Sequence, residues 1–259
     1  MKNIDRVLEK VGNGITIPYY VKCDDGNVYV VKFPGNCEGK KALINEFIAS
    51  NLCKLLGLPI FPFELIHVSL QDYSPLMKDD VDFIEGTAFG TLYNENVLPV
   101  IGARYVKKST NFFDATRILL FDLLMGNYDR NKGNLMIDSK TKQLFMLDHT
   151  HLFNLGTIWN ETELYRTKDD LFDLKKLHPY NCAHLVEAIS YRSSFDCQLQ
   201  FFVKKVKNIS VDDLKKIIDE IPDDWDISDG EKRALIIYIY ERFQRIDQAL
   251  ELLNLKEGV

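Results

Sequence analysis

The sequence lacks a long hydrophobic run, both at its start and along its length. No stretch of the 259 residues approaches the roughly 18 uncharged apolar residues that span a bilayer. Residues 1–5 show none of the apolar core of a secretory signal. We therefore expect a cytoplasmic protein with no membrane partner.

Cysteine is scarce and follows no recognisable spacing. The five cysteines are widely separated, form no Cys-x-x-Cys pair and have no histidine at the spacing of a zinc site. This pattern argues against a disulfide framework and against a zinc finger. We expect reduced and mostly buried thiols at Cys23, Cys37, Cys53, Cys182 and Cys197.

An excess of basic residues is also missing. The formal net charge is −6, from 32 basic and 38 acidic side chains, which disfavours a surface built to neutralise nucleic-acid phosphates. No Gly/Ser/Pro-rich tract interrupts a composition that is 46% hydrophobic and 27% charged. Such a composition is typical of a compact globular chain, and its length fits one large domain or two packed lobes.

The order of the predicted elements indicates an α+β protein with a strand-rich N-terminal part and a helix-rich C-terminal part. Turn residues mark the hairpins, and apolar residues at helical spacing mark the helices. The predicted elements are a hairpin over 15–33, a helix over 40–56 ending at Gly57, strands and loops over 60–107, a helix over 114–125 ending at Gly126, a second hairpin from 135–137 and 144–147, and helices from about 168 onward, including 210–220 and 228–253.

The strongest chemical signal lies between the helix over 114–125 and the end of the second hairpin. The loop holds Asp129 and, five residues later, Asn134, and the hairpin then delivers Asp148. Carboxylate and amide oxygens are the ligands that Mg²⁺ prefers. Asp-x-x-x-x-Asn is the spacing of the protein-kinase catalytic loop, whose Asp accepts the substrate hydroxyl proton and whose Asn holds a metal. The same spacing also occurs in solvated turns, so the surrounding sequence must distinguish a catalytic loop from an ordinary turn.

Upstream residues supply that context. Lys32 lies in an apolar strand, where a buried lysine needs an anion such as an ATP phosphate; the alternative is an edge-strand lysine that points into water. Glu46 lies on the following helix, placed either to pair with Lys32 as a kinase glutamate does or to face solvent. Gly12 and Gly14 precede the hairpin, where their amides could cover nucleotide phosphates or form an ordinary turn.

Taken together, these residues resemble the HipA-like kinase family, in particular the short bacterial members without the extra N-terminal domain of the HipA toxins. The resemblance runs from about Gly12 to Phe153. Its specific blocks are residues 121–134 and 147–149. Supporting blocks are the Gly-x-Gly at 12–14, Asp25-Gly26-Asn27 with 29–33, Asn45-Glu46, 55–59 and Phe89-Gly90-Thr91.

The resemblance implies a bilobal protein-kinase-like fold that uses ATP and Mg²⁺. It implies a small β-rich N-lobe over 1–93 and a larger helical C-lobe over 94–259. Lys32 and the glycines at 12 and 14 would clamp ATP, Asn134 and Asp148 would hold Mg²⁺, and Asp129 would receive the hydroxyl proton. Phe89 and Gly90 would lie near the inter-lobe hinge against the adenine.

The sequence departs from the eukaryotic kinase pattern after the catalytic loop. His149-Thr150 follows Asp148, so there is no Asp-Phe-Gly, and no Ala-Pro-Glu appears later. We therefore do not expect control by a eukaryotic activation loop, although hydroxyls for phosphorylation are present at Thr150, Thr157 and Thr162.

Arg130 and two histidines need separate interpretations. We assign Arg130 to the catalytic set, orienting Asp129 or an incoming phosphate; the alternative is a structural ion pair. We interpret His149 as a packing or supporting residue rather than a metal ligand, because two oxygen ligands are already present. His151 would share the face of His149 in a strand.

The leading hypothesis is a serine/threonine protein kinase with ATP as cofactor and a protein as substrate. A small-molecule or lipid kinase is the second enzyme reading, since the fold resemblance extends to phosphatidylinositol kinases. A nucleotide-binding pseudokinase or scaffold is the non-enzymatic alternative. The family also suggests toxins of the toxin–antitoxin kind, so an antitoxin or regulator as partner stays open.

Overall fold

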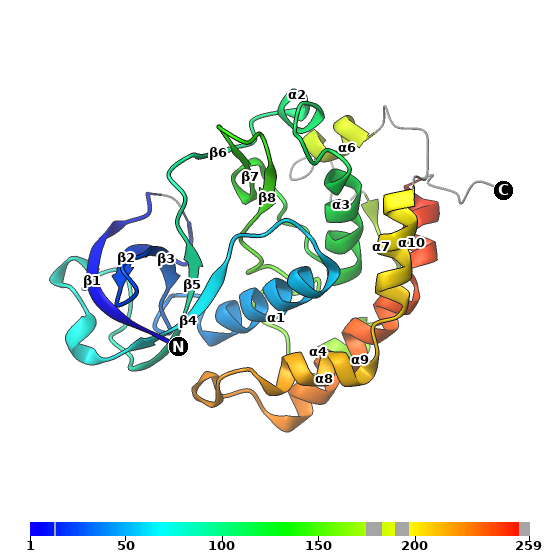
Figure 1. The fold of residues 1–259 in the computed structure, drawn as a ribbon. Helices are drawn as coiled ribbons and strands as arrows, with labels where there is room; N and C mark the ends of the chain where they lie inside the picture. Colours follow the sequence, from blue (N-terminus) through cyan, green and yellow to red (C-terminus); the bar gives the residue numbers. More distant parts are fainter. Residues whose placement is uncertain (13, 175–182, 190–196, 254–259) are drawn as a thin grey trace.

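A five-stranded closed barrel forms the N-terminal part of the computed structural model, which describes residues 1–12, 14–174, 183–189 and 197–253. The strands follow the spatial order β1-β2-β3-β5-β4, and β1 closes the barrel by pairing in parallel with β4. In Figure 1 the barrel lies on the left. The strands are β1 (Lys2–Lys10), β2 (Tyr19–Cys23), β3 (Val28–Lys32), β4 (Phe63–Val68) and β5 (Gly86–Leu92).

The predicted first hairpin is formed by β2 and β3. Its first strand begins at Tyr19 rather than at residue 15. Asp25 forms the turn, because its Oδ1 accepts the Asn27 amide at 3.0 Å. Alternate residues of β2 point into the barrel and are buried with those of its neighbours. The sequence did not predict β1, whose nine residues are mostly charged and partly exposed.

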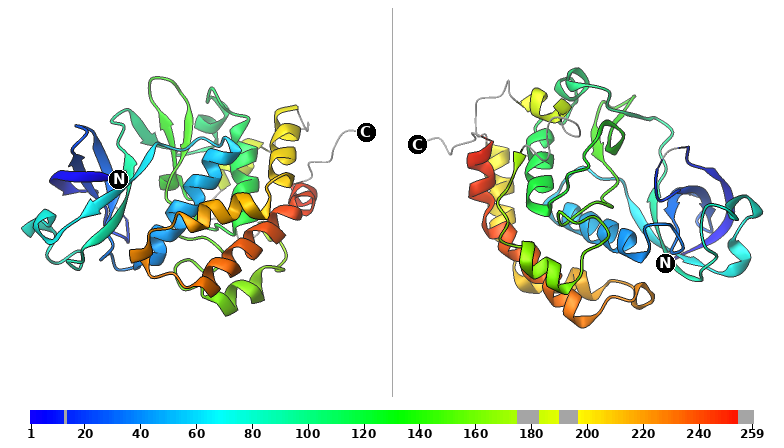
Figure 2. Two further views of the ribbon diagram at one scale, coloured as in Figure 1. Left: turned by 60° about the horizontal axis from the view of Figure 1, so that its bottom comes forward. Right: turned by 180° about the vertical axis from the view of Figure 1, so that it is seen from behind.

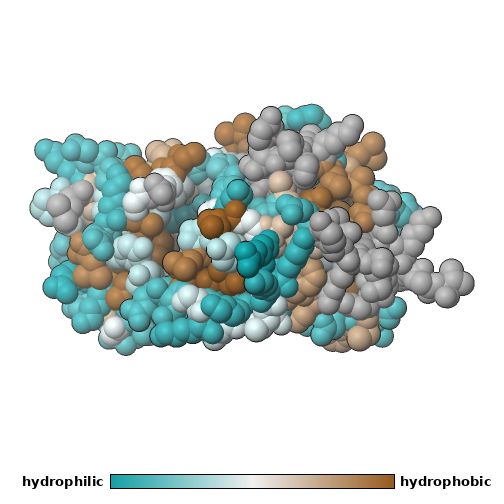
Figure 3. Space-filling model, turned by 90° about the horizontal axis from the view of Figure 1, so that it is seen from above, coloured by the Kyte–Doolittle hydropathy of each residue, from teal (hydrophilic) through white to brown (hydrophobic). Residues whose placement is uncertain are grey.

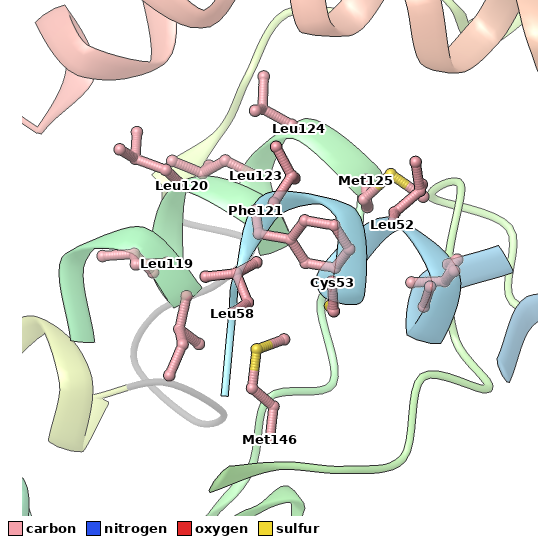
Figure 4. Packing of buried hydrophobic residues seen from close by; sticks show 14 of the residues in the cluster. Leu52, Cys53, Leu58, Leu119, Leu120, Phe121, Leu123, Leu124, Met125 and Met146 are labelled. Carbon is pink, nitrogen blue, oxygen red and sulfur yellow. The ribbon is translucent and has the colours of Figure 1, made fainter. Parts of the chain in front are cut away.

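Helix α1 (Lys40–Leu56) follows β3 and belongs to the main hydrophobic core. It ends as predicted at Gly57, which takes the left-handed conformation (φ 72°) that glycine adopts without steric cost. Helix α3 (Asp114–Met125) ends in the same way at Gly126 (φ 63°). Figure 4 shows side chains of α1 and α3 packing against one another within this core.

A second, three-stranded sheet lies beside α3 and has the order β6-β7-β8. It contains the predicted second hairpin, β7 (Leu135–Asp138) and β8 (Leu144–Met146), preceded by a 3₁₀ turn at Lys132–Asn134. The sequence predicted strands and loops over 60–107 without marking strand β6 (Val97–Pro99) separately. The hairpin β7–β8 thus begins directly after Asn134 and ends two residues before Asp148.

Helices make up most of the remaining C-terminal part. Two of them begin where the sequence predicted, at 210 and 228, because Ser210 and Ser228 cap them: each accepts the amide of the residue three positions later. The helix predicted over 228–253 is instead two helices that meet at Arg245, whose guanidinium bonds the carbonyls of Lys168 and Asp170. The helices are α2 (Ala103–Lys107), α4 (Glu161–Thr167), α6 (Ala183–Ile189), α7 (Cys197–Lys207), α8 (Val211–Asp219), α9 (Asp229–Gln244) and α10 (Ile246–Leu252), with 3₁₀ turns at Leu70–Asp72, Pro75–Met77 and Asp223–Trp225.

The molecule is therefore an α+β protein with a β-rich N-terminal lobe and a larger helical lobe, as Figure 2 shows from two further sides. The boundary at 93/94 stays a prediction. It falls between β5, the last barrel strand, and β6, while α1 packs with the helical lobe through α7 and α8. Within the described ranges, no helix has the length and apolar character needed to cross a bilayer.

The prediction of mostly buried cysteines holds for only some of them. Cys23 and Cys53 are buried, whereas Cys37 and Cys197 are exposed, and all four are free thiols. Burial raises the pKa of the Cys23 thiol to about 12, so this group stays protonated. Cys182 lies outside the described residues.

Candidate active site

A cavity of about 740 Å³ lies where the barrel meets the second sheet. Its walls come from β2, β3 and β5, from the loop after α3, and from the segment after β8. Figure 3 looks down on the molecule, with apolar groups showing among polar ones in the middle of the face. Of the predicted site residues, those that line the cavity are Gly12, Gly14, Lys32, Glu46, Phe89, Asp129, Asn134 and Asp148.

Lys32 is the centre of a buried polar network. Its Nζ donates to Glu46 Oε1 at 2.5 Å, to Asp148 Oδ1 at 2.9 Å and to Thr150 Oγ1 at 2.7 Å. Burial alone would lower the pKa of Lys32, but the carboxylates of Asp148 and Glu46 outweigh it and raise the pKa above its ordinary value. Burial would likewise raise the pKa of Glu46, and Lys32 holds it below its usual range. The lysine is therefore a fixed cation inside the cavity.

The loop after α3 holds Asp129 and Asn134 together. The Asn134 Nδ2 donates to the Asp129 carbonyl at 2.6 Å and to its Oδ2 at 3.1 Å. Asn131 Nδ2 donates to Asp129 Oδ1 at 3.1 Å, while its own oxygen accepts the Gly133 amide at 2.7 Å. These short-range bonds fix the carboxylate in one orientation toward the cavity.

Asp148 reaches the same cavity from the residues that follow β8. It has a positive φ of 55°, uncommon for a residue other than glycine. Burial would raise the pKa of Asp148, but Lys32 and the Thr150 amide keep it below the usual range, so the carboxylate is ionised. The Asn134 nitrogen is already used by Asp129, which leaves its amide oxygen as a metal donor. One carboxylate and one amide oxygen fit Mg²⁺, which needs only one or two protein ligands.

Arg130, predicted to be catalytic, lies outside the cavity lining and is fully buried. Its guanidinium forms a two-point ion pair with Asp122, at 3.0 and 3.1 Å. Its Nη1 also donates to the carbonyls of Asn134 at 2.6 Å and Leu147 at 2.7 Å. Since both carbonyls belong to segments that carry site residues, we replace the catalytic assignment with a positioning one.

The predicted hinge residues point in different directions. Phe89 lines the cavity and pairs across the sheet with Lys32. Gly90 is not among the lining residues, because successive strand residues face opposite sides; a side chain there would approach Ile66 Cδ1 to 2.3 Å. Gly90 therefore serves barrel packing rather than nucleotide contact.

The glycines near residue 13 lie in the loop that joins β1 to β2. Both Gly12 and Gly14 line the cavity, and Asn13 between them lies outside the described residues. The loop closes where the Val11 amide donates to the Pro18 carbonyl at 2.8 Å. The loop therefore forms part of the cavity wall.

A family model for HipA-like kinases matches residues 4–256, nearly the whole chain. The chain belongs to the HipA-like kinase family. The match includes the segments that carry Asp129, Asn134 and Asp148, and extends well beyond the resemblance at 12–153 that the sequence motifs indicated.

Solved kinase structures are similar to this HipA-like kinase over nearly its whole length. A Helicobacter pylori proinflammatory kinase, CtkA, is 14% identical, with 99% of this chain and 97% of that chain covered and a TM-score of 0.52. The Golgi casein kinase is 12% identical, covering 98% of this chain and 74% of that chain, with a TM-score of 0.57. A structure of the Golgi casein kinase with Mn/ADP bound is 11% identical, with 97% of this chain and 73% of that chain covered and a TM-score of 0.55. At these identities the likeness shows the kinase fold. No curated protein matched.

Two residues that line the cavity of the HipA-like kinase, His151 and Glu38, were not among the predicted site residues. His151 Nε2 lies 3.2 Å from Glu38 Oε1, and its Nδ1 lies 3.5 Å from Asp129 Oδ2. Hydrogen bonds to the two carboxylates raise the pKa of His151 to about 10, so the ring is a second cation in the cavity wall. The sequence signal was the His-x-His after Asp148, but nothing local marked Glu38 as its partner.

His149 is the supporting residue that the sequence predicted. It is buried, and its Nδ1 lies 3.5 Å from Glu46 Oε2. Its backbone amide donates to Glu46 Oε1 at 3.0 Å. Thr150 is buried beside it, so this hydroxyl belongs to the Lys32 network and is not open to phosphorylation from solvent.

Proposed function

We propose that this HipA-like kinase transfers the γ-phosphoryl group of Mg²⁺-ATP to a serine or threonine hydroxyl of a protein. The observation that carries the proposal is the cavity shared by Lys32, Asp129, Asn134 and Asp148 in a chain of this family. Kinase catalysis relies mainly on positioning and on charge stabilisation. The residues that share the cavity would supply a base, two metal donors and a fixed cation.

Each residue has a role that follows from its contacts. Lys32, held by Glu46 and Asp148, would bind nucleotide phosphates. Gly12 and Gly14 would cover them with backbone amides. Asn134 and Asp148 would hold Mg²⁺, which supplies Lewis-acid stabilisation of phosphate charge when bound.

Asp129 would orient the substrate hydroxyl and accept its proton. Burial would raise the pKa of Asp129, but contacts with His151 and Asn131 keep it below the ordinary value. The carboxylate is therefore ionised and ready to accept a hydrogen bond at neutral pH. Hydrogen bonds from the side-chain amides of Asn131 and Asn134 fix the orientation of the Asp129 carboxylate.

Related structures support the cofactor part of the proposal. The similar Golgi casein kinase has been solved with Mn/ADP bound, a nucleotide with a divalent ion. Its name also refers to a protein substrate, casein. The lining also suits a nucleotide, because the apolar residues Val30, Phe89 and Leu147 share the cavity with the cation of Lys32.

Incubation with [γ-³²P]ATP and Mg²⁺ tests the proposal, with casein as a generic protein acceptor and phosphoamino-acid analysis of the product. The wild-type chain should yield phosphoserine or phosphothreonine. Asp129→Asn and Asp148→Ala should lower the rate by at least about 100-fold, the scale for loss of a general base or a metal ligand. Asp212→Asn, an exposed carboxylate of α8, is the matched control and should keep full activity.

Each alternative gives its own pattern in this assay. Label in phosphatidylinositol vesicles but not in protein would make the chain a lipid kinase. ATP-dependent thermal stabilisation without any transfer would make it a nucleotide-binding scaffold. Equal labelling by the wild type, Asp129→Asn and Asp148→Ala would refute the assignment of the site.

A further inference from the structure

A single buried amide connects α1 to the segment that follows Asp148. The Asn45 Nδ2 donates to the Thr150 carbonyl at 2.6 Å and to the Gly156 carbonyl at 2.9 Å. Its Oδ1 accepts the indole N–H of Trp159 at 2.9 Å. Asn45 has no exposed surface, and its amide uses both donor hydrogens and its oxygen.

The neighbouring residue attaches the same helix to the same segment from the cavity side. Glu46 accepts the Lys32 ammonium and the His149 amide, at 2.5 and 3.0 Å. One turn earlier, Lys41 bonds the Trp159 carbonyl and lies 4.3 Å from the centre of its ring. The segment from 149 to 159 is thus fixed to α1 at both ends and in its middle.

We propose that Asn45 is a positioning residue that fixes the 149–159 segment against α1, so that the Lys32–Glu46–Asp148 network forms without phosphorylation of that segment. The proposal rests on the proposed kinase function and concerns the same site. Asn45 does not itself line the cavity; it acts through the backbone, by bonding the carbonyls of Thr150, which does line the cavity, and of Gly156.

Buried polar contacts favour this interpretation over a flexible segment ordered by phosphate. A phosphate orders a kinase loop by giving cationic side chains a partner. Here the Thr150 hydroxyl already accepts from Lys32 inside the core. Lys41 already has the Trp159 carbonyl and Glu231 as partners. The bonds that a phosphate would supply are made by the fold itself.

Asn45→Leu removes all three bonds while keeping the side-chain volume close to its original value. Trp159→Phe removes only the indole bond. The matched control is Asn51→Leu, because Asn51 lies on the same helix and its Nδ2 donates to Phe47 within that helix. We expect kcat/KM for Mg²⁺-ATP to fall on the order of tenfold or more for Asn45→Leu, less for Trp159→Phe and little for Asn51→Leu.

The KM for Mg²⁺-ATP separates positioning from simple destabilisation. A variant that only unfolds more easily loses active molecules and keeps its KM. Asn45→Leu should raise KM at temperatures where circular dichroism shows it fully folded, because Lys32 and Asp148 lose their fixed separation. An unchanged KM, with a rate loss that matches the loss of folded protein, would overturn the proposal.

Phosphatase treatment tests the second half of the proposal. Wild-type protein treated with phosphatase, and the Thr157→Ala/Thr162→Ala variant, should show full initial rates without a lag. A lag that shortens with ATP preincubation would show that phosphorylation assembles the site, and would overturn the inference. Wild-type protein that transfers no phosphate under any condition would instead refute the kinase function.

Discussion

Loss of either member of the buried pair of Arg130 and Asp122 should destabilise the fold strongly, because the pair has a structural role and takes no direct part in the chemistry. Both side chains are fully buried, and the pair is joined by two hydrogen bonds of 3.0 and 3.1 Å. Removing one member leaves the other charge buried without an opposite charge beside it, which costs about 3–5 kcal/mol. That is a large fraction of the roughly 5–15 kcal/mol that stabilises a native domain.

Arg130→Met keeps most of the side-chain length and removes the charge, and Asp122→Asn neutralises the partner. Each should lower the free energy of unfolding by about 3–5 kcal/mol, measured by urea denaturation with the fluorescence of the buried Trp159 and Trp225 as the probe. In the double variant no charge is left buried alone, so its loss should be smaller than the sum of the single losses.

Activity assays on the same variants complete the test. Arg130 also holds the carbonyls of Asn134 and Leu147, so Arg130→Met should lower the transfer rate together with stability. Arg130→Lys cannot reproduce the planar two-point pairing and should recover only part of either quantity. An Arg130→Met variant with unchanged unfolding energy and abolished phosphate transfer would contradict this reasoning and restore the catalytic assignment.

Two further outcomes are expected. Gly126→Ala should lower the melting temperature more than Gly57→Ala. Both glycines have positive φ, but only at Gly126 would the new methyl lie 2.3 Å from Asn154 Oδ1. Equal decreases in melting temperature would exclude that clash. The pKa of His151 is raised from 6.5 to about 10 in the folded chain, so the stability it adds is present in full below pH 6.5 and is lost as pH rises toward 10. The difference in unfolding energy between wild type and His151→Gln should therefore shrink over that pH range, and a constant difference would refute the ion pairs.

Local signals in the sequence predicted most of the helices and hairpins near the site. The ends of α1 and α3 depend on Gly57 and Gly126, and the starts of α8 and α9 depend on Ser210 and Ser228. Each of these signals acts over three or four residues, so the sequence alone contains it. The spacing of Asp129 and Asn134 is local in the same sense, because one loop holds both.

Strand β1 and the break at Arg245 were missed for the opposite reason. The nine residues of β1 carry little alternation, since register shifts interrupt its pairing with β2 and much of it faces solvent. The apolar period of residues 228–253 continues through Arg245, while the contacts at the break come from a segment more than 70 residues earlier. Periodicity cannot report such contacts.

The residue types and their spacing can be taken from the sequence alone: an aspartate, an asparagine and a second aspartate at kinase spacing, and a lysine in an apolar strand. Which of these side chains meet depends on tertiary packing. Lys32 contacts Asp148, which lies 116 residues later in the chain, and Arg130 points away from the cavity toward Asp122. The strand pleat turns Phe89 toward the cavity and position 90 toward Ile66 inside the barrel. A side chain's type is fixed by its codon, but its direction depends on the packing of every element around it.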